Sequence, residues 1–487
     1  MTSRRVLISA DHGLAIVYFL QTEVVPRLLQ AGVEVKLLTE DSLVDRVRER
    51  FGGPALTVEG LRLDRAQHFA DSRRPELQWW LAFLRRVGGS RHINTRAMDS
   101  YIQQVAVEES NWRRIWLPLG WLAIGLLRRS AAARRALVAA QARFSPPLYR
   151  DLLEDFRPDL VLASTPGWRL DRYLLREARA AGLRTASVVV GWDNPSSYSI
   201  PGARVDDVIC WSSVQRQELE LGSDWPPQRV HIGGIPIYDG YLQRRWQLPR
   251  QEYFRRHELD PDRKLLAYAC SFVSFSPNIQ NVEALARLVV QDQLDEPAQL
   301  LVRLHPNHFM DVQAFAEERQ RIRQMACDLP HVKVVEPVPL GEGLGHYSGE
   351  DMDEKSSMMA HADVFLTVYS TMVVEAALHD RPIVSACLDS PTGWDWPRKY
   401  TLPLSQIGDW PTHRRFREAG AGKVAQDDRQ LREAINAGLS APQAESPARR
   451  AFVEREITYT DGSAGRRTAE HLLALISGRD GRRSAAE

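Results

Sequence analysis

Short continuous apolar runs alternate with helix-spaced apolar patterns along most of the chain. Residues 6–10 form a short apolar run, residues 14–29 follow with helical spacing, and residues 33–38 form a second run. Buried parallel strands consist of continuous apolar residues because helices cover both faces of their sheet. The chain therefore begins with a predicted strand–helix–strand unit whose loops lie over the carboxyl ends of the strands.

The same alternation divides the chain into two halves. In the first half, later strands are predicted at 160–164, 185–190, 208–211 and 230–232; in the second half, at 264–270, 299–304, 332–336 and 363–368. Between the halves, residues 237–262 are polar and helical. A chain of 487 residues is too long for one hydrophobic core. We predict a first domain over 1–236, a second over 237–480 and a disordered tail over 481–487.

Residues 71–150 break the alternation, because they are rich in Arg and Trp and lack strand patterns. They predict a helical insertion in the first domain. Within it, residues 113–129 place an apolar segment between two arginine pairs, and this segment is too short to span a bilayer. It could lie in a membrane interface, with Trp at the headgroups and Arg outside. It could instead pack on the domain or on a second subunit, and the soluble-type helix at 131–143 favours packing.

Composition limits the classes of function. The chain is 44% apolar and 26% charged, which is typical of a globular protein, and its net charge of +1 favours no nucleic-acid partner. The four cysteines share no metal-binding spacing and are expected to be reduced. The D-x-D at 351–353 precedes a predicted helix, which favours capping over metal binding. Without a signal peptide or a spanning run, we expect a cytoplasmic protein, at the inner face of the membrane if 113–129 is interfacial.

The segment that follows the predicted strand at 363–368 carries the most informative polar residues. Tyr369, Ser370 and Thr371 form a turn before a helix, and Glu375 lies within the apolar run VVEAAL, where a carboxylate is costly without a partner. Thr371 and Glu375 share one helix face. Hydroxyls beside free backbone N–H groups suit a phosphate, and a carboxylate one turn deeper suits ribose hydroxyls. The alternative is an ordinary capped helix whose Glu375 binds backbone.

Polar residues also follow the predicted strands of the first half. His12 follows the first strand, Thr165 follows the strand at 160–164, and Trp192, Asp193 and Asn194 follow the strand at 185–190. Ligands of open α/β sheets bind at this edge, so these residues are candidates for an acceptor site. Alternatively, His12 is a polar loop residue or a helix cap, and the Asn-Pro segment is a simple turn.

The second half offers a matching set of candidates. Ser271 and Ser274 lie in the loop SFVSFSPN after a predicted strand, where hydroxyls and backbone N–H groups suit an anion. Arg303 and His305 lie at the end of the next strand. There is no G-x-G-x-x-G after the first strand, which disfavours a dinucleotide site.

These features together resemble the GT-B architecture, in which two Rossmann-like domains face a cleft and the second binds most of the nucleotide donor. The segment Tyr369-Ser370-Thr371-x-x-x-Glu375, followed by Arg381-Pro382, resembles the donor signature of GT-B glycosyltransferases. The R-x-H-P at 303–306 and the Asp-Gly at 461–462 are similar to CDP-glycerol glycerophosphotransferases and bacterial surface-polysaccharide transferases. The loop at 11–13 differs from the early G-T-R-P of the epimerases that share this fold.

The resemblance implies a glycosyltransferase that moves a sugar from a nucleotide-sugar donor to a saccharide or lipid-linked acceptor in bacterial surface glycan or glycolipid synthesis. A CDP-glycerol-type glycerophosphotransferase and a non-catalytic scaffold are the alternatives. It further implies no cofactor and no bound metal. The implied donor-binding residues are Ser271, Ser274, Arg303, His305, Ser370, Thr371 and Glu375. The implied acceptor-binding residues are Thr165, Trp192 and Asn194, with His12 as the base and Asp193 as the orienting residue or the alternative base.

Overall fold

The computed structural model describes residues 4–271, 277–338, 349–390 and 402–478, which form two compact α/β units. Unit 1 comprises Met1–Ile102, Glu109–Asp239 and Ile457–Glu487, and unit 2 comprises Gln103–Glu108 and Gly240–Glu456. Each unit has its own parallel sheet and its own buried apolar core. The prediction of two Rossmann-like domains is confirmed.

Unit 1 contains a seven-stranded parallel sheet in the order β3-β2-β1-β4-β5-β6-β7. Its strands are β1 Arg5–Ser9, β2 Glu34–Thr39, β3 Leu56–Gly60, β4 Leu160–Ala163, β5 Arg184–Val188, β6 Asp207–Cys210 and β7 Val230–Ile232. The order reverses between β1 and β4, which pair with Ser9 opposite Ala163. This reversal is a topological switch point, where open α/β sheets bind ligands.

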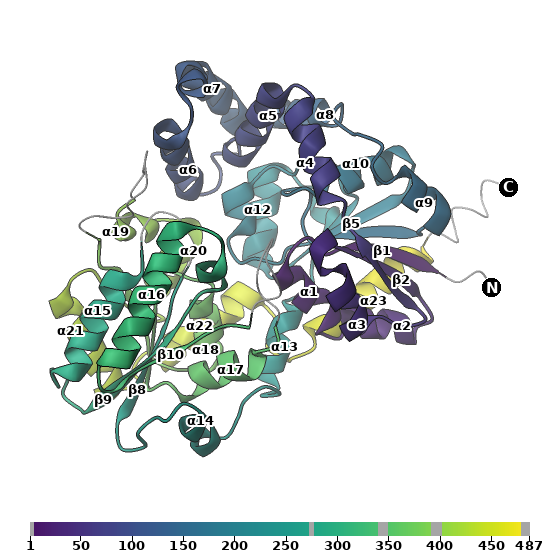
Figure 1. Ribbon diagram of the computed structural model, residues 1–487. Coiled ribbons are helices and arrows are strands. Elements are labelled where there is room, and N and C mark those ends of the chain that lie inside the picture. The colour runs from purple at the N-terminus through teal and green to yellow at the C-terminus, as the bar shows by residue number, and fades with distance from the viewer. Residues whose placement is uncertain (1–3, 272–276, 339–348, 391–401, 479–487) are drawn as a thin grey trace. The chain divides into compact units, whose positions relative to one another are not determined.

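Helices connect these strands and form a separate group between β3 and β4. Around the sheet lie α1 Gly13–Leu20, α2 Val24–Gln30, α3 Val44–Phe51, α10 Arg172–Ala180, α11 Asn194–Tyr198 and α12 Ser213–Ser223. The segment between β3 and β4 forms α4 Leu63–Ser72, α5 Pro75–Val87, α6 Arg96–Glu108, α7 Asn111–Arg129, α8 Ala131–Gln141 and α9 Arg150–Phe156. Figure 1 shows α5, α7 and α8 gathered together, away from β1 and β2.

Unit 2 contains a six-stranded parallel sheet in the order β10-β9-β8-β11-β12-β13. Its strands are β8 Lys264–Ala269, β9 Ala298–Arg303, β10 Val332–Val335, β11 Val364–Thr367, β12 Ile383–Ala386 and β13 Lys423–Ala425. Its helices are α14 Arg250–Arg256, α15 Ile279–Val290, α16 Gln313–Asp328, α17 Met352–His361, α18 Met372–Leu378, α19 Leu404–Ile407, α20 Pro411–Ala419, α21 Asp428–Ser440 and α22 Ser446–Ile457, with a short 3-10 helix, η3, at Pro306–Phe309. The order reverses between β8 and β11, the second switch point.

The end of the chain departs from the predicted domain boundary. We predicted that the second domain extends to residue 480, but residues from Ile457 onward belong to unit 1. Helix α23, Ala464–Ser477, packs beside α2, as the yellow ribbon among purple elements shows in Figure 1. The Asp239 carboxylate accepts hydrogen bonds from the backbone N–H groups of Ala464 and Gly465 at 3.0 and 2.8 Å. This buried carboxylate holds the start of α23 on unit 1.

Candidate active site

His12 lies at the switch point of unit 1, directly before α1. Its Nδ1 atom is 2.6 Å from Oδ1 of Asp11, whose side chain is 1% exposed. An ionised carboxylate can only accept hydrogen bonds, so Nδ1 carries the proton that lies between the two groups. The pair therefore fixes the orientation of the ring from one side and leaves Nε2 as the nitrogen that can act as a general base.

Two further groups hold Asp11 as a carboxylate. Ser164, which follows β4, donates its hydroxyl proton to Oδ1 at 2.6 Å, and Arg169 Nε lies 2.9 Å from Oδ2. Burial acts to raise the pKa of Asp11, but the charges of His12 and Arg169 and the hydrogen bonds overcome it and hold the pKa well below its ordinary range. Asp11 therefore stays ionised at neutral pH and can stabilise the positive charge that forms when the ring takes a proton.

Thr165 lies beside this pair, but its hydroxyl already has two partners. It donates to Oδ2 of Asp171 at 2.6 Å and accepts from the backbone N–H of Trp168 at 3.0 Å. Burial and the nearby charge of Asp11 raise the pKa of Asp171 to about 7. Thr165 and Asp171 thus fix the loop after β4. Both contacts of the Thr165 hydroxyl are made within this loop.

The loop after β5 holds the other acceptor candidates. Asp193 is half-buried and accepts a hydrogen bond from the Ser197 hydroxyl at 2.7 Å. Asn194 Oδ1 accepts from the backbone N–H of Gly191 at 2.9 Å, which closes the turn. Trp192 is 1% exposed, so its side chain belongs to the core and offers no open surface to an acceptor. Asp193 and Asn194 remain candidates, whereas Trp192 is a buried residue.

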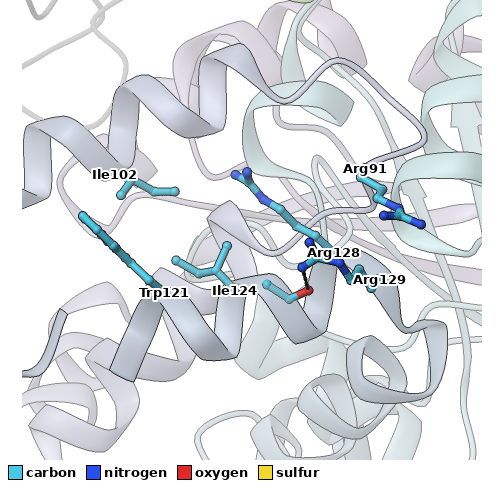
Figure 2. A pocket seen from close by; sticks show the side chains of 7 residues that line it. Arg91, Ile102, Trp121, Ile124, Arg128 and Arg129 are labelled. Carbon is cyan, nitrogen blue, oxygen red and sulfur yellow. Dashed lines mark hydrogen bonds between the residues drawn. The ribbon is translucent and has the colours of Figure 1, made fainter. Parts of the chain in front are cut away.

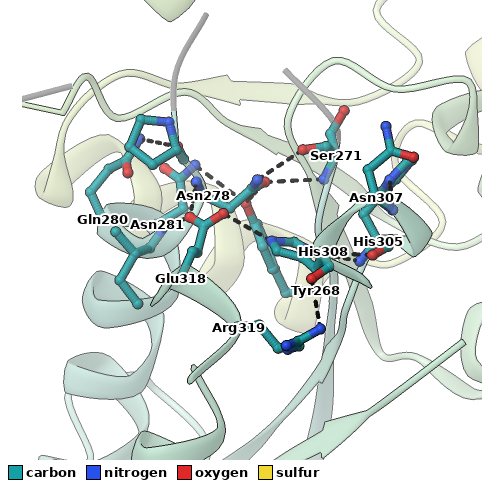
Figure 3. Close-up of polar contacts among 12 residues, drawn as sticks. Tyr268, Ser271, Asn278, Gln280, Asn281, His305, Asn307, His308, Glu318 and Arg319 are labelled. Carbon is teal, nitrogen blue, oxygen red and sulfur yellow. Dashed lines mark hydrogen bonds and ion pairs between the residues drawn. The ribbon is translucent and has the colours of Figure 1, made fainter. Parts of the chain in front are cut away.

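A buried histidine–carboxylate pair organises the corresponding edge of unit 2 (Figure 3). His305 donates its backbone N–H to Nδ1 of His308 at 3.0 Å, and His308 Nε2 lies 2.9 Å from Oε2 of Glu318. His305 Nδ1 in turn accepts from the backbone N–H of Asn307 at 3.1 Å. The predicted donor residue His305 is therefore held at the start of η3, where its ring is partly exposed.

Glu318 also fixes the segment that precedes α15. Its Oε1 atom accepts from the backbone N–H groups of Asn278 and Ile279 at 2.5 and 2.7 Å. The Asn278 amide clamps Ser271 by accepting from its N–H at 3.0 Å and donating to its carbonyl at 2.8 Å. Both ends of the predicted phosphate loop are thus held together by side chains. Ser274 lies outside the described residues.

Arg303 and Glu375 are each buried and paired within unit 2. Arg303 forms an ion pair with Asp351, and both side chains are 5% exposed. Glu375 Oε2 lies 2.6 Å from Nζ of Lys355 and accepts a 2.6 Å hydrogen bond from the Tyr241 hydroxyl. The alternative in which Glu375 binds backbone is therefore not observed, because two side chains bind its carboxylate.

The turn between β11 and α18 is strained and partly open. Tyr369 has a φ of 25°, in the left-handed region that non-glycine residues rarely occupy. The next two residues, Ser370 and Thr371, are half-buried, and the Ser370 hydroxyl accepts from the N–H of Met372 at 3.3 Å. Backbone strain of this kind clusters at ligand-binding turns. The turn lies at the switch point of unit 2, as the donor-site prediction requires.

Several residues of these sites were missed from the sequence. Asp11 was detectable, because it directly precedes His12 at a strand-to-helix loop. Asp171, His308, Glu318 and Lys355 gave no signal, since each meets its partner only through the fold. Among the described residues, no group of three or more His, Cys, Asp or Glu side chains is placed to hold a metal ion.

The family comparison covers the donor half. Residues 223–474 match the model of the CDP-Glycerol:Poly(glycerophosphate) glycerophosphotransferase family, which is more than half of the 487 residues. The chain belongs to this family. It is therefore a transferase of the glycosyltransferase or glycerophosphotransferase type. The matched range contains all the donor candidates of unit 2, whereas His12 and Asp193 lie outside it. A search of the curated proteins gives no match.

Solved structures share the architecture at low sequence identity. A putative UDP-N-acetylglucosamine 2-epimerase from Listeria monocytogenes is 12% identical, with a TM-score of 0.52 over 99% of this chain and 98% of that chain. The UDP-GlcNAc 2-epimerase from Neisseria meningitidis bound to UDP-GlcNAc is 12% identical, with a TM-score of 0.51 over 96% and 100%. A glycosyltransferase from Rickettsia africae is 9% identical, with a TM-score of 0.52 over 98% and 99%. These similarities confirm the predicted GT-B fold.

Proposed function

We propose that this protein transfers glycerol phosphate from CDP-glycerol to a hydroxyl group of a surface-polymer or lipid-linked acceptor. The observation that carries the proposal is the family match, which runs through the whole of β8 to β13 and includes the turn at Ser370 and Thr371. The family description names CDP-glycerol as donor and poly(glycerophosphate) as acceptor. The His12–Asp11 pair supplies a base of the kind that such a transfer needs.

The proposed reaction is a phosphoryl transfer. The acceptor oxygen attacks the phosphorus that carries glycerol, the P–O bond to CMP breaks, and CMP leaves with the bonding electrons. The acceptor proton passes to Nε2 of His12, whose positive charge Asp11 stabilises. Asp193 orients the acceptor hydroxyl, or acts as the base if His12 does not, and Asn194 fixes the loop that carries it.

Donor binding is assigned to the switch point of unit 2. The hydroxyls of Ser370 and Thr371, together with nearby backbone N–H groups, bind phosphate oxygens, and His305 stabilises the charge of the leaving group. Ser271 and Ser274, the latter outside the described residues, complete the proposed set of phosphate-binding hydroxyls. Glu375, oriented by Lys355 and Tyr241, binds the ribose hydroxyls. Arg303 is a positioning residue that acts through Asp351. The proposal includes neither a bound metal nor a cofactor.

The second candidate is glycosyl transfer, which the sequence placed first. It is favoured by the shared fold with a glycosyltransferase and with an epimerase bound to UDP-GlcNAc. In that reaction the acceptor oxygen attacks the sugar C1 atom, the C1–O bond breaks, and a nucleoside diphosphate leaves. The same base and the same donor turn would serve, so the released nucleotide distinguishes the two reactions.

We also propose that the acceptor is met at a membrane surface, at the cytoplasmic side, through residues 113–129. Among the described residues, no helix is long and apolar enough to cross a bilayer. Contact would therefore be peripheral, through the exposed apolar side chains of α7.

The test is to identify the nucleotide product. The protein is incubated with CDP-glycerol or with UDP-sugars, in the presence of poly(glycerophosphate) or a bacterial lipid extract, and the nucleotides are separated by chromatography. Acceptor-dependent CMP is expected, UDP would establish the second candidate, and release of neither with no thermal shift by CDP, UDP, GDP or dTDP would favour a scaffold.

A further inference from the structure

Helix α7 packs on unit 1 through one apolar face. Its buried side of Leu117, Gly120, Ile124 and Leu127 recurs at helical spacing. A Cβ atom added at Gly120 would lie 2.9 Å from the Trp80 ring, so the helix approaches α5 closely at this glycine. The packing predicted for 113–129 is therefore present, and this face of α7 is buried.

A second apolar face of the same helix is exposed. Its members are between 42% and 72% exposed, far more than core residues. They are Trp112, Ile115, Trp116, Leu119, Leu122 and Leu126. Their spacing of three, four and seven residues makes one continuous stripe, which we call the exposed α7 face. A contiguous apolar surface of this kind marks an interaction site, since scattered exposed residues would not align.

A basic pocket lies at the carboxyl end of α7 (Figure 2). Its volume is about 340 Å³, and it is lined by Arg91, Ile102, Trp121, Ile124, Gly125, Arg128 and Arg129. In Figure 2, Trp121 and Ile102 lie toward one end of the pocket and Arg91 toward the other. The pocket therefore combines an apolar, aromatic part with three guanidinium groups.

The three arginines are incompletely neutralised. Arg128 Nη1 pairs with Asp99 at 2.8 Å and Nε donates to the Val87 carbonyl at 3.1 Å, but its buried Nη2 has no hydrogen-bond partner within the described residues. Arg129 Nη1 donates to the backbone carbonyl of Gly125 at 3.0 Å, and within the part of the chain that the structure describes this side chain forms no ion pair. Arg91 is exposed at the pocket. Among the described residues, Asp99 is the one carboxylate paired with these three guanidinium groups, so the pocket is suited to an anion.

We propose that this pocket binds the phosphate headgroup of an anionic membrane lipid while the exposed α7 face lies against the acyl region. The inference rests on the proposed membrane contact and names its specific ligand. Tryptophan and arginine are the residues that such interfaces favour, because the indole suits the headgroup level and the guanidinium binds phosphate. A protein partner would match the apolar face only if it also brought acidic side chains to the three arginines.

Vesicle binding of the full chain tests the membrane contact. The protein is sedimented with phosphatidylcholine vesicles that do or do not contain phosphatidylglycerol, at low and high salt. Binding is expected only with phosphatidylglycerol and should weaken with salt, since ions screen the attraction. Leu122→Asp should weaken it about tenfold or more, whereas Leu221→Asp, on α12 and also exposed, should not change it.

A pair of arginine variants on one helix tests the pocket itself. Arg129→Gln and Arg114→Gln remove the same charge from α7, but only Arg129 lines the pocket. We expect Arg129→Gln to weaken binding about fivefold, the effect of one basic residue at an anionic surface, and Arg114→Gln about twofold or less. Arg91→Gln should resemble Arg129→Gln. The thermal shift produced by CDP should be unchanged in all three, because donor binding belongs to unit 2.

Each other result overturns part of the inference. Equal losses for Arg129→Gln and Arg114→Gln would show that the pocket is not the lipid site, while the membrane contact would stand. Absence of vesicle binding by the parent would overturn the membrane contact. A dimer in sedimentation velocity that Leu122→Asp dissociates would show that the exposed α7 face binds a second copy of the chain. Loss of the CDP thermal shift alone would point to a failure of the donor assignment rather than of this inference.

Discussion

Two histidines at the edges of the two sheets show how the same residue pair can serve chemistry or structure. His12 binds a buried carboxylate through Nδ1 only, and within the described residues no group bonds its Nε2. His308 also binds a buried carboxylate, but its Nδ1 accepts the His305 N–H and its Nε2 faces Glu318. Both nitrogens of His308 are therefore occupied.

The difference lies in what each carboxylate does besides binding its histidine. Asp11 accepts a hydrogen bond from Ser164 and forms an ion pair with Arg169, and both keep it charged and in place. Glu318 instead accepts two backbone N–H groups at the start of α15 and so fixes a loop. A histidine–carboxylate pair is thus evidence for catalysis only when one ring nitrogen remains open to substrate.

The largest effect should come from Asp11→Asn. This variant keeps the side chain's size but cannot stabilise an imidazolium or fix the same tautomer, so we expect kcat to fall by about 10²- to 10⁴-fold. Donor-dependent thermal shifts should stay unchanged. The measurement is acceptor-dependent nucleotide release at saturating donor. A folded variant with the parent kcat would show that Asp11 does not assist His12 in the reaction.

Removing the Glu318 charge from the His308–Glu318 pair of unit 2 should lower the stability of the fold. Glu318→Gln leaves the His308 ring and two backbone N–H groups with weaker partners, and we expect the free energy of unfolding to fall by about 2–4 kcal/mol in urea titrations. Its exposed neighbour supplies the control, since Glu317→Gln should stay within about 0.5 kcal/mol. Equal effects of the two variants would show that the buried network is not stabilising.

Glu375→Ala should weaken nucleotide binding by about 1–3 kcal/mol, the scale of a hydrogen bond to a charged group. Lys355→Met removes the partner but keeps the carboxylate, so it should weaken binding less. Both affinities are measured by calorimetry with CDP and CDP-glycerol. If the two variants lose equally, Glu375 acts only by positioning Lys355; if neither loses, the carboxylate has no part in the donor site.

The last effect concerns pH and is spread over several pH units. The pKa of Asp171 is raised from 3.8 to about 7, so the folded protein holds a proton that the unfolded chain releases over that window. The protonated Asp171 stabilises the folded state fully below about pH 4. As pH rises from about 4 through about 7, the free energy of unfolding falls by at most about 1.4 kcal/mol per pH unit. Asp171→Asn should flatten the stability profile in this window. A parallel profile would show that Asp171 titrates normally.

The sequence predicted the frame of the sites well. Strand ends are visible as apolar runs followed by polar residues, and parallel strands bring those ends to one edge, so His12, Thr165 and Asp193 could be placed in unit 1 and His305 and Ser370 in unit 2. The role of α7 was visible only in part. Its composition indicated an apolar helix, but which face packs and which remains exposed depends on the neighbouring α5.

What sequence reasoning could not supply is the partner of each buried polar side chain. Glu375 was recognised as unusual, yet its partners Tyr241 and Lys355 lie 134 and 20 residues away along the chain. Thr165 and Trp192 were placed at the correct edge, but their burial takes them out of direct contact with an acceptor. The return of α23 to unit 1 depends on Asp239, a carboxylate that no local pattern connects to residue 464.

The central claim is that His12 removes the acceptor proton, and turnover of His12→Ala beside donor affinity tests it most directly. We predict that kcat for nucleotide release falls by about 10²-fold or more while the dissociation constant for the donor is unchanged, because the base acts on the acceptor only. Asp193→Asn, measured in parallel, should retain more activity than His12→Ala. Turnover of His12→Ala at the parent rate would contradict the account, and loss of turnover in Asp193→Asn alone would exchange the two roles.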